Sequence, residues 1–430
     1  MTQIWKFILL FSLYVTLLTS CGTESTPGVG PNPNSPYPTF RGQEFKGEKN
    51  FAYLMNNFQE GVAKPSPWAG YWWPYSANGI ASGGFFASHS PAGKYDAARG
   101  NTTHAQSWEL KNHGARVPHL QQWWGHCNGW CAAAALFPEP TEAVVVNGIT
   151  FGIGDIKALL SETGMSANAD FFGERIDVDD SSSPKYWDTV PDQYFLVLTN
   201  YLGKLKKTVL IDRYTGSQVW NQPLAGYRLQ YPKPEDYLGN TPESPNVYRI
   251  LVTSTLWWME DNVPPDVQTP PFSFEEAEGT GVVSSRTLTM EVWLDAPVAF
   301  DHSGKITSSG DVIVAREGDY LAGGSWRSHG GYDVDAWPDY MWVPYAVSKP
   351  VDGDQDYVNP EVDIDWIRKH LLVAGGLDDT SVTPGAIAPA PILSPFPGMG
   401  FPGSGIPGMG SPGMPWPTPT PTSPPPWSVR

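Results

Sequence analysis

Cysteine is scarce in this chain, with 3 residues in 430. So small a number excludes the dense disulfide framework of small secreted domains. Cys127 and Cys131 have no second Cys/His pair at the spacing of a structural zinc site, so the sequence predicts no metal site. Basic residues are also few, since 27 Lys and Arg stand against 44 Asp and Glu, a net charge of −17. This balance excludes a broad basic surface, and we expect no nucleic-acid partner.

The apolar run Phe7–Leu18 is too short to predict a membrane-spanning helix. It follows Lys6 and leads into Leu18-Thr19-Ser20-Cys21, a pattern that resembles a bacterial lipoprotein signal. We therefore expect residues 1–20 to be a signal peptide. Cys21 is then the lipidated first residue of an exported chain that is anchored to a membrane, at the outer membrane or the cell surface. The alternative is an ordinary secretory signal with a cysteine by chance.

Composition divides the rest of the chain into three parts. Residues 21–60 are rich in Pro, Gly, Asn, Thr and Ser, and we expect a flexible tether. Residues 377–430 are Pro/Gly-rich low complexity, which predicts a disordered tail. Residues 61–376 lie between them. With 40% hydrophobic and 13% aromatic residues overall, the chain can build one large folded domain there.

Hydrophobic periodicity predicts both helices and strands in that domain. Helices are expected at Gly154–Leu160 and Asp363–Ala374. The strand candidates are Gln193–Leu198, Thr208–Asp212, Tyr248–Trp257, Leu288–Leu294 and Asp311–Ala315. Because helices come early and strands dominate later, we expect an α+β fold with N-terminal helices packed on an antiparallel sheet.

The run Gly125–Ala132 carries the chemistry that the sequence points to. Cys127 precedes an alanine-rich stretch, so it is placed at the start of a helix, where unpaired backbone N–H groups and the helix dipole lower a thiol pKa. This setting predicts a cysteine nucleophile. The competing interpretation is a small buried residue in a Gly/Trp-rich packing motif, which is also how we interpret Cys131, one turn further on.

Further blocks flank this run in a fixed order. They are Pro67–Pro74, Ser90–Asp96, Trp123–Trp130, Gly154–Leu160, Val219–Tyr227, Gly323–Trp326 and Pro338–Pro344. In this order they resemble the transglutaminase elicitor family, known from plant-pathogenic oomycetes and from bacteria. The most specific block, Val219–Tyr227, is similar to the peptide of the oomycete enzyme that plants perceive as foreign. The resemblance runs from about residue 65 to 345.

The resemblance implies a papain-like cysteine protease fold and acyl transfer from protein glutamine to a primary amine. Cys127 matches the nucleophile, which attacks the Gln carboxamide, releases ammonia and passes the acyl group on to lysine, a polyamine or water. Asp212 matches the acidic residue that orients a histidine. The implied partners are proteins with accessible Gln and Lys side chains, or polyamines.

The histidine itself is absent from its family position. The family places it in a strand that leads into the turn Asn200–Gly203, where this chain has Gln193, Tyr194, Phe195 and Leu196. Loss of a general base typically costs about 10²–10⁴-fold in rate. We therefore test His302 and His329, both near predicted strand ends, as substitutes.

An oxyanion-stabilising donor is also suggested by spacing. Gln121 precedes Cys127, and the spacing between them along the sequence is similar to that between the oxyanion-hole glutamine and the catalytic cysteine of papain-like enzymes. The indole N–H groups of Trp123 and Trp124 are alternatives, and plain aromatic packing is the competing explanation for all three.

Two rival functions stay open. A papain-like thiol peptidase or amidase would use the same residues with water as acceptor. A catalytically silent surface domain would bind protein, or glycan through paired tryptophans such as Trp72-Trp73. A calcium requirement is compatible with the family but is not indicated by the sequence, because Asp177, Asp179 and Asp180 lack the EF-hand pattern, and we assign no cofactor-binding residue.

Overall fold

The computed structural model describes residues 45, 47–83, 90–173, 191–214, 218–275, 277, 279–314, 324–327, 338–347 and 358–376. All of them lie in one compact unit, Met1–Pro397, and a second unit comprises Gly398–Arg430. Cys21, the aspartates at 177–180 and the expected tail lie outside the described residues. Within the described ranges, no helix has the length and apolar character that a membrane span requires.

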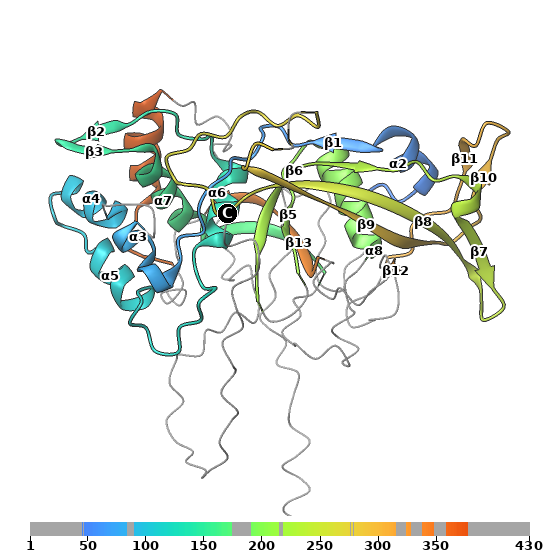
Figure 1. Ribbon diagram of the computed structural model, residues 1–430, viewed down its shortest axis with the longest axis horizontal. Helices are drawn as coiled ribbons and strands as arrows, with labels where there is room; N and C mark the ends of the chain where they lie inside the picture. The colour runs from blue at the N-terminus through green and yellow to red at the C-terminus, as the bar shows by residue number, and fades with distance from the viewer. Residues whose placement is uncertain are drawn as a thin grey trace, which may run out of the picture. The chain divides into compact units, whose positions relative to one another are not determined.

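An antiparallel sheet of nine strands lies at the centre of the described part (Figure 1). Seven strands follow the order β12-β9-β8-β6-β5-β13-β4, while β1 pairs with β6 and β7 pairs with β8. These strands are β1 (Glu60–Val62), β4 (Ala167–Gly173), β5 (Leu210–Asp212), β6 (Asn221–Leu229), β7 (Tyr237–Thr241), β8 (Ser244–Met259), β9 (Val283–Leu294), β12 (Ser325–Arg327) and β13 (Tyr340–Val347). Two hairpins are separate from the sheet: β2 (Val144–Val146) with β3 (Ile149–Phe151), and β10 (Ala299–Phe300) with β11 (Ile306–Ser308).

Alternation of side chains explains the long strands. In β8, Ile250, Val252, Ser254 and Leu256 are buried at every second position, as a half-buried strand requires. The predicted strands at 208–212, 248–257 and 288–294 are confirmed as β5, β8 and β9. The candidate at 311–315 is represented only by isolated bridges at Asp311 and Val312 in the described residues.

The α-helices are α2 (Phe51–Asn57), α3 (Gly79–Ser82), α4 (Pro91–Ala98), α5 (Ala105–Asn112), α6 (Cys127–Leu136), α7 (Ile153–Gly164), α8 (Pro191–Val197) and α9 (Ile364–Ile367). Helices α3, α4, α5, α6 and α7 gather at one end of this unit, whereas α2 lies toward the other end, near β10 and β11, and α8 lies beside β9 (Figure 1). Short 3₁₀ segments are η1 (Tyr75–Ala77), η4 (Pro234–Asp236) and η7 (Val373–Gly375), and π-helical segments are η3 (Leu198–Lys204) and η6 (Arg368–Leu372). The expected helices at 154–160 and 363–374 are found as α7 and as α9 with η6 and η7. The expected α+β fold is thereby confirmed.

Helix α6 is apolar on every side because it is enclosed by α7 and by the sheet strands β6 and β13. Two glycines allow the close crossing of α6 and α7. A Cβ at Gly129 would clash with the carbonyl oxygen of Ser161, and one at Gly164 would clash with that of Gly129. The crossing therefore depends on the missing side chains of Gly129 and Gly164.

The folded body begins earlier than the sequence predicted. Part of the segment expected to be a tether, residues 21–60, forms α2 and the start of β1. Phe45 and Phe51 are buried in the core, and Asn50 caps α2 by accepting a hydrogen bond from the Tyr53 N–H. Four apolar side chains of α2 that face inward explain why this Pro/Gly-rich region still folds.

The strand predicted at Gln193–Leu198 is wrong, because these residues form α8 and the start of η3. A short apolar run is compatible with a strand or a buried helix, and periodicity alone does not separate the two. Pro191 and Asp192 in the first turn favour the helix. Asn200–Gly203 consequently lies within the π-helical segment η3 and not in a turn after a strand.

Candidate functional site

Cys127 is the first residue of α6, with His126 in the N-cap position. It is 6% exposed, and its Sγ lies 3.6 Å from Asn128 Oδ1 and 3.9 Å from the Val219 carbonyl oxygen. The helix begins here because the alanines that follow are strong helix formers. The expected position of the cysteine, at the start of a helix that packs on the antiparallel sheet, is found.

A buried polar cluster lies beside the cysteine, where β6 begins. The Asn221 Nδ2 donates hydrogen bonds to Asn128 Oδ1 and, at 3.2 Å, to Tyr340 Oη. The Trp342 indole N–H donates to Asn221 Oδ1 at 2.8 Å. Asn221 thus connects the start of α6 with strand β13.

Asp212 is fully buried at the end of β5 and is paired in register with Asn221. Its Oδ1 accepts a hydrogen bond from the Trp220 N–H at 2.8 Å, and its backbone carbonyl accepts one from the Asp339 N–H at 3.0 Å. The structure therefore brings together Cys127 and Asp212, the two residues that the sequence assigned to one site, at adjacent positions of α6 and the sheet.

Asp261, just after β8, is a carboxyl group that sequence reasoning did not select. Burial raises its pKa to about 6, although the nearby Arg213 guanidinium opposes this shift. Burial and the charge of Asp261 also raise the pKa of the Cys127 thiol to about 12, with Asp212 adding to the effect. At neutral pH the Cys127 sulfur is therefore a thiol and not a thiolate.

The ring of His126 contacts two buried carboxylates. Its Nε2 lies 2.6 Å from Glu162 Oε2 and 3.0 Å from Glu109 Oε1. Burial alone lowers the pKa of His126, but the charges of Glu109 and Glu162 outweigh it and raise the pKa to about 10. This imidazole is occupied by the two carboxylates and does not serve the thiol.

The two substitute histidines have different outcomes. His302 is exposed in the turn between β10 and β11, at the end of the sheet opposite to α6 (Figure 1), so its assignment as a base for Cys127 is wrong. The hairpin of β10 and β11 was not among the strands expected from the sequence, and the sequence does not show at which end of the sheet this turn lies. His329 lies outside the described residues.

The oxyanion candidates are close to the cysteine in sequence and differ in burial. Gln121 is exposed, and its backbone carbonyl accepts a hydrogen bond from the Trp124 N–H. Trp123 and Trp124 are half-buried and pack edge to face, with ring centroids 6.2 Å apart. The role of Gln121 stays a prediction.

Three of the paired tryptophans are part of the core. Trp73, Trp257 and Trp258 are buried, whereas Trp72 is half-buried and packs against Trp220 with ring centroids 5.9 Å apart. Aromatic packing therefore accounts for three of these side chains without a glycan.

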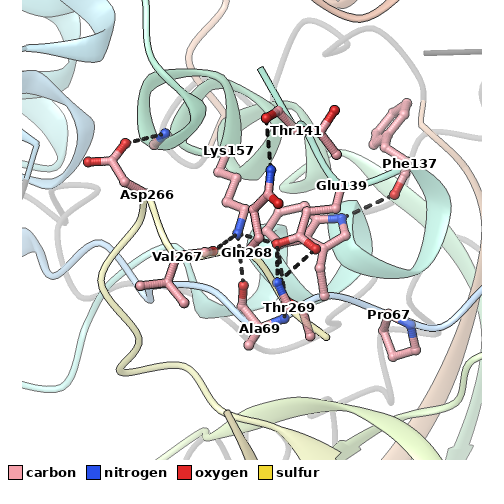
Figure 2. Close-up of polar contacts among 12 residues, drawn as sticks. Pro67, Ala69, Phe137, Glu139, Thr141, Lys157, Asp266, Val267, Gln268 and Thr269 are labelled. Carbon is pink, nitrogen blue, oxygen red and sulfur yellow. Dashed lines mark hydrogen bonds and ion pairs between the residues drawn. The ribbon is translucent and has the colours of Figure 1, made fainter. Parts of the chain in front are cut away.

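A buried lysine holds the loop that follows Asp261 against α7 (Figure 2). The Lys157 ammonium donates to Glu139 Oε1 at 2.6 Å, to the Val267 carbonyl at 2.8 Å and to the Ala69 carbonyl at 3.2 Å. Glu139 in turn accepts from the Thr269 N–H at 3.0 Å. These contacts fix the segments at Ala69, Glu139 and Val267 against α7.

Sequence reasoning missed Asn128, Asn221, Tyr340, Trp342 and Asp261. The first four lie in blocks that the sequence analysis had already noted: Asn128 follows the cysteine, Asn221 is in the most specific family block, and Tyr340 and Trp342 are in the last one. Asp261 lies outside these blocks. Their convergence depends on strand order, which no local pattern shows.

Comparisons with known proteins agree with this fold. The model of a family described as transglutaminase elicitor matches residues 109–237, which include Cys127, Asp212 and Asn221, and this confirms the resemblance drawn from the motifs. No curated protein matches the chain. The crystal structure of the GP42 transglutaminase from Phytophthora sojae is similar, with a TM-score of 0.52, 21% sequence identity, and coverage of 77% of this chain and 95% of that chain. At that identity the likeness shows the fold.

Proposed function

Since residues 109–237 match the model of the transglutaminase elicitor family, we propose that this domain transfers the acyl group of a protein-bound glutamine to a primary amine, with Cys127 as nucleophile. The observation that carries the proposal is the position of Cys127 at the first turn of α6, facing the start of β6 beside the buried carboxyl of Asp212. Backbone N–H groups at a helix start favour a developing thiolate.

The proposed reaction has two balanced steps. The deprotonated sulfur of Cys127 attacks the carboxamide carbon of glutamine, the C–N bond breaks, and the nitrogen leaves as ammonia after taking up a proton. The amine of a lysine or polyamine then attacks the thioester carbon, the C–S bond breaks, and a proton moves from the amine to the sulfur. With water as acceptor the product is glutamate, and the glutamine substrate is only deamidated.

A base for the first step is required because the thiol is protonated at neutral pH. His126, which precedes the cysteine, is held by two carboxylates, and of the two substitutes that the sequence suggested, His302 lies at the far end of the sheet. His329 is therefore our proposed base. In the sequence it precedes Asp339, whose N–H bonds to the carbonyl of Asp212, the residue that the family uses to orient its histidine.

A catalytically silent surface domain is the second candidate, and one observation favours it. The thiol of Cys127 is buried, and burial together with Asp261 holds its pKa near 12. Such a thiol is inert unless a base or a conformational change activates it. In this case the fold is retained for binding to protein or glycan.

Thiol labelling and amine transfer together separate these functions. For the acyltransferase we expect alkylation of Cys127 by iodoacetamide near pH 6 that is much faster than that of an ordinary cysteine, and incorporation of a labelled amine into a glutamine-bearing protein. Cys127→Ala should abolish both signals and His329→Ala should lower both, by about 10²–10⁴-fold for amine transfer. Cys131→Ala, which changes a fully buried thiol, is the matched control and should retain most activity.

Other outcomes decide against the proposal. Slow labelling of Cys127 that rises only at alkaline pH, without amine transfer, supports the silent domain. Cleavage of peptide bonds that does not depend on amine assigns the thiol peptidase instead.

A further inference from the structure

Four buried side chains with metal-ligating atoms meet between α5, α6 and α7. They are Glu109 in α5, His113 at its C-cap, His126 at the N-cap of α6 and Glu162 in α7. One ligand atom from each lies within 4.8 Å of all the others. None of the four residues is more than 2% exposed, so water does not solvate this cluster.

The ligand atoms of the cluster contact one another closely. His126 Nε2 is 2.6 Å from Glu162 Oε2 and 3.0 Å from Glu109 Oε1, and His113 Nδ1 is 3.2 Å from Glu109 Oε1. The Nε2 of His113 is a buried atom without a hydrogen-bond partner. Two imidazoles and two carboxylates that converge in this way, out of contact with water, form a ligand set for one metal ion.

Outer contacts orient the two acidic side chains and one imidazole. Nδ1 of His126 lies 3.4 Å from the carbonyl oxygen of Trp73, which directs Nε2 toward the cluster. The Asn359 N–H donates to Glu162 Oε1 at 2.6 Å, and its Nδ2 lies 3.4 Å from Glu109 Oε2. Backbone and amide partners of this kind are what holds metal ligands in a fixed orientation.

An aromatic ring and a glycine enclose the cluster. Tyr75 stacks on the His113 ring with centroids 4.3 Å apart and lies edge to face with His126 at 5.0 Å. At Gly79, a Cβ would come within 3.0 Å of Glu109 Oε1 and 3.1 Å of His126 Cε1. The protein thus surrounds the four ligand atoms and leaves no place for a bulky ligand.

We propose that Glu109, His113, His126 and Glu162 form a structural site for one divalent transition-metal ion, and that their chemistry selects zinc. Two imidazole nitrogens and two carboxylate oxygens match tetrahedral zinc, with ligand distances of about 2.0–2.2 Å. Imidazole disfavours calcium and magnesium, which prefer oxygen ligands. Two carboxylates and two neutral imidazoles also balance the charge of one divalent cation.

Such an ion would join α5, α6 and α7 and so fix the start of α6. His126 immediately precedes Cys127, and its backbone N–H donates to the Trp72 carbonyl at 2.7 Å. The position of the cysteine therefore depends on how His126 is held. Because all four positions are filled by protein, the ion is structural and not a catalytic centre. This inference does not rest on the acyl-transfer proposal.

The test uses the untagged full chain. We expect elemental mass spectrometry of the purified protein to find about one zinc per chain, and removal of zinc by a chelator to lower Tm. The stripped protein should take up one equivalent of Co²⁺ with the visible bands of four-coordinate cobalt. His113→Gln and Glu162→Gln should each weaken zinc binding by at least about 100-fold. His104→Gln, at an exposed histidine that begins the same helix α5, should leave binding unchanged.

A cluster of imidazolium–carboxylate pairs without metal is the alternative, and it gives different results. A stripped wild-type chain that binds neither Zn²⁺ nor Co²⁺ stoichiometrically, with Tm indifferent to zinc, overturns the proposal. Retention of full zinc affinity in both ligand variants also overturns it. If the variants do not fold, the Co²⁺ spectrum and the zinc titration of the wild-type chain decide the question alone.

Discussion

Asn221 accepts a hydrogen bond from the indole of Trp342 at 2.8 Å, across the strand β5 that separates β6 from β13. Both residues are at most 1% exposed. The orientation of Asn221 on β6 thus depends on a donor two strands away. Because Asn221 also contacts Asn128, the start of α6 at Cys127 depends on both residues.

Trp342→Phe tests this contact. The change removes the donor and leaves Asn221 Oδ1 buried without it, which we expect to lower the free energy of unfolding by about 1–3 kcal/mol. Urea unfolding monitored by circular dichroism measures the difference. Trp123→Phe, at a half-buried indole outside the sheet, is the control and should change stability by less than about 0.5 kcal/mol. Equal effects of the two variants would contradict the role of the hydrogen bond.

Lys157→Met tests the buried ammonium shown in Figure 2. The Lys157 side chain is 2% exposed and its partner Glu139 15%, so removal of the cation leaves a largely buried carboxylate without its counter-charge. We expect a loss of about 3 kcal/mol in unfolding free energy. Arg228→Met is the control, because the ion pair of Arg228 with Glu60, at 2.9 Å, joins side chains that are 46% and 56% exposed. It should cost at most about 1 kcal/mol, and a larger loss there than at Lys157 would refute the argument.

Asp261 predicts a pH dependence of stability. Its pKa is about 6 in the folded chain and near its ordinary value of 3.8 when unfolded, so between these values the folded state binds more protons. Stability from this group is therefore present below about pH 4 and is lost as the pH rises through 6, by about 3 kcal/mol in total. Asp261→Asn removes the titration. Unfolding free energies of both proteins from pH 4 to 7 measure it, and a wild-type minus variant difference that is flat over this range contradicts the prediction.

Cys21→Ala tests the proposed lipid anchor. The pattern Leu18-Thr19-Ser20-Cys21 predicts that the wild-type chain partitions with membranes after processing. We expect the substitution to release the protein or to block its maturation, as seen by membrane fractionation and by mass of the N-terminal peptide. Substitution of Cys131, which is buried in α6, is the control. Unchanged membrane association of the Cys21→Ala protein would exclude the anchor.

Much of the fold was predictable because local patterns dominate it. Strand β8 shows its alternation directly, and α7 shows an acidic first turn at Asp155 followed by an apolar face. Helix α8 was mistaken for a strand because nearly all of its side chains are buried, which erases any periodicity. The wrong prediction at α8 therefore concerns a helix that has no exposed face.

The site was only partly predictable. Cys127 and Asp212 each follow from a local motif, whereas Asp261 is selected by its burial next to the thiol, a property of the assembled sheet. The metal-ligand cluster shows the same limit. Glu109 and His113 have the spacing of one helical turn, but His126 and Glu162 come from other helices, so the sequence contains only half of a recognisable pattern.

The strand β6 has a consequence for any receptor that reads this chain as a foreign peptide. The block Val219–Tyr227 lies largely within β6, whose residues from Asn221 to Tyr227 are all buried and hydrogen-bonded to β5, β8 or β1. In the folded protein this stretch is therefore not available as a linear epitope. A receptor that binds this stretch in extended form can do so only after the protein has unfolded or been cleaved by a protease. Recognition would then depend on unfolded or cleaved protein, because the folded protein does not expose the stretch.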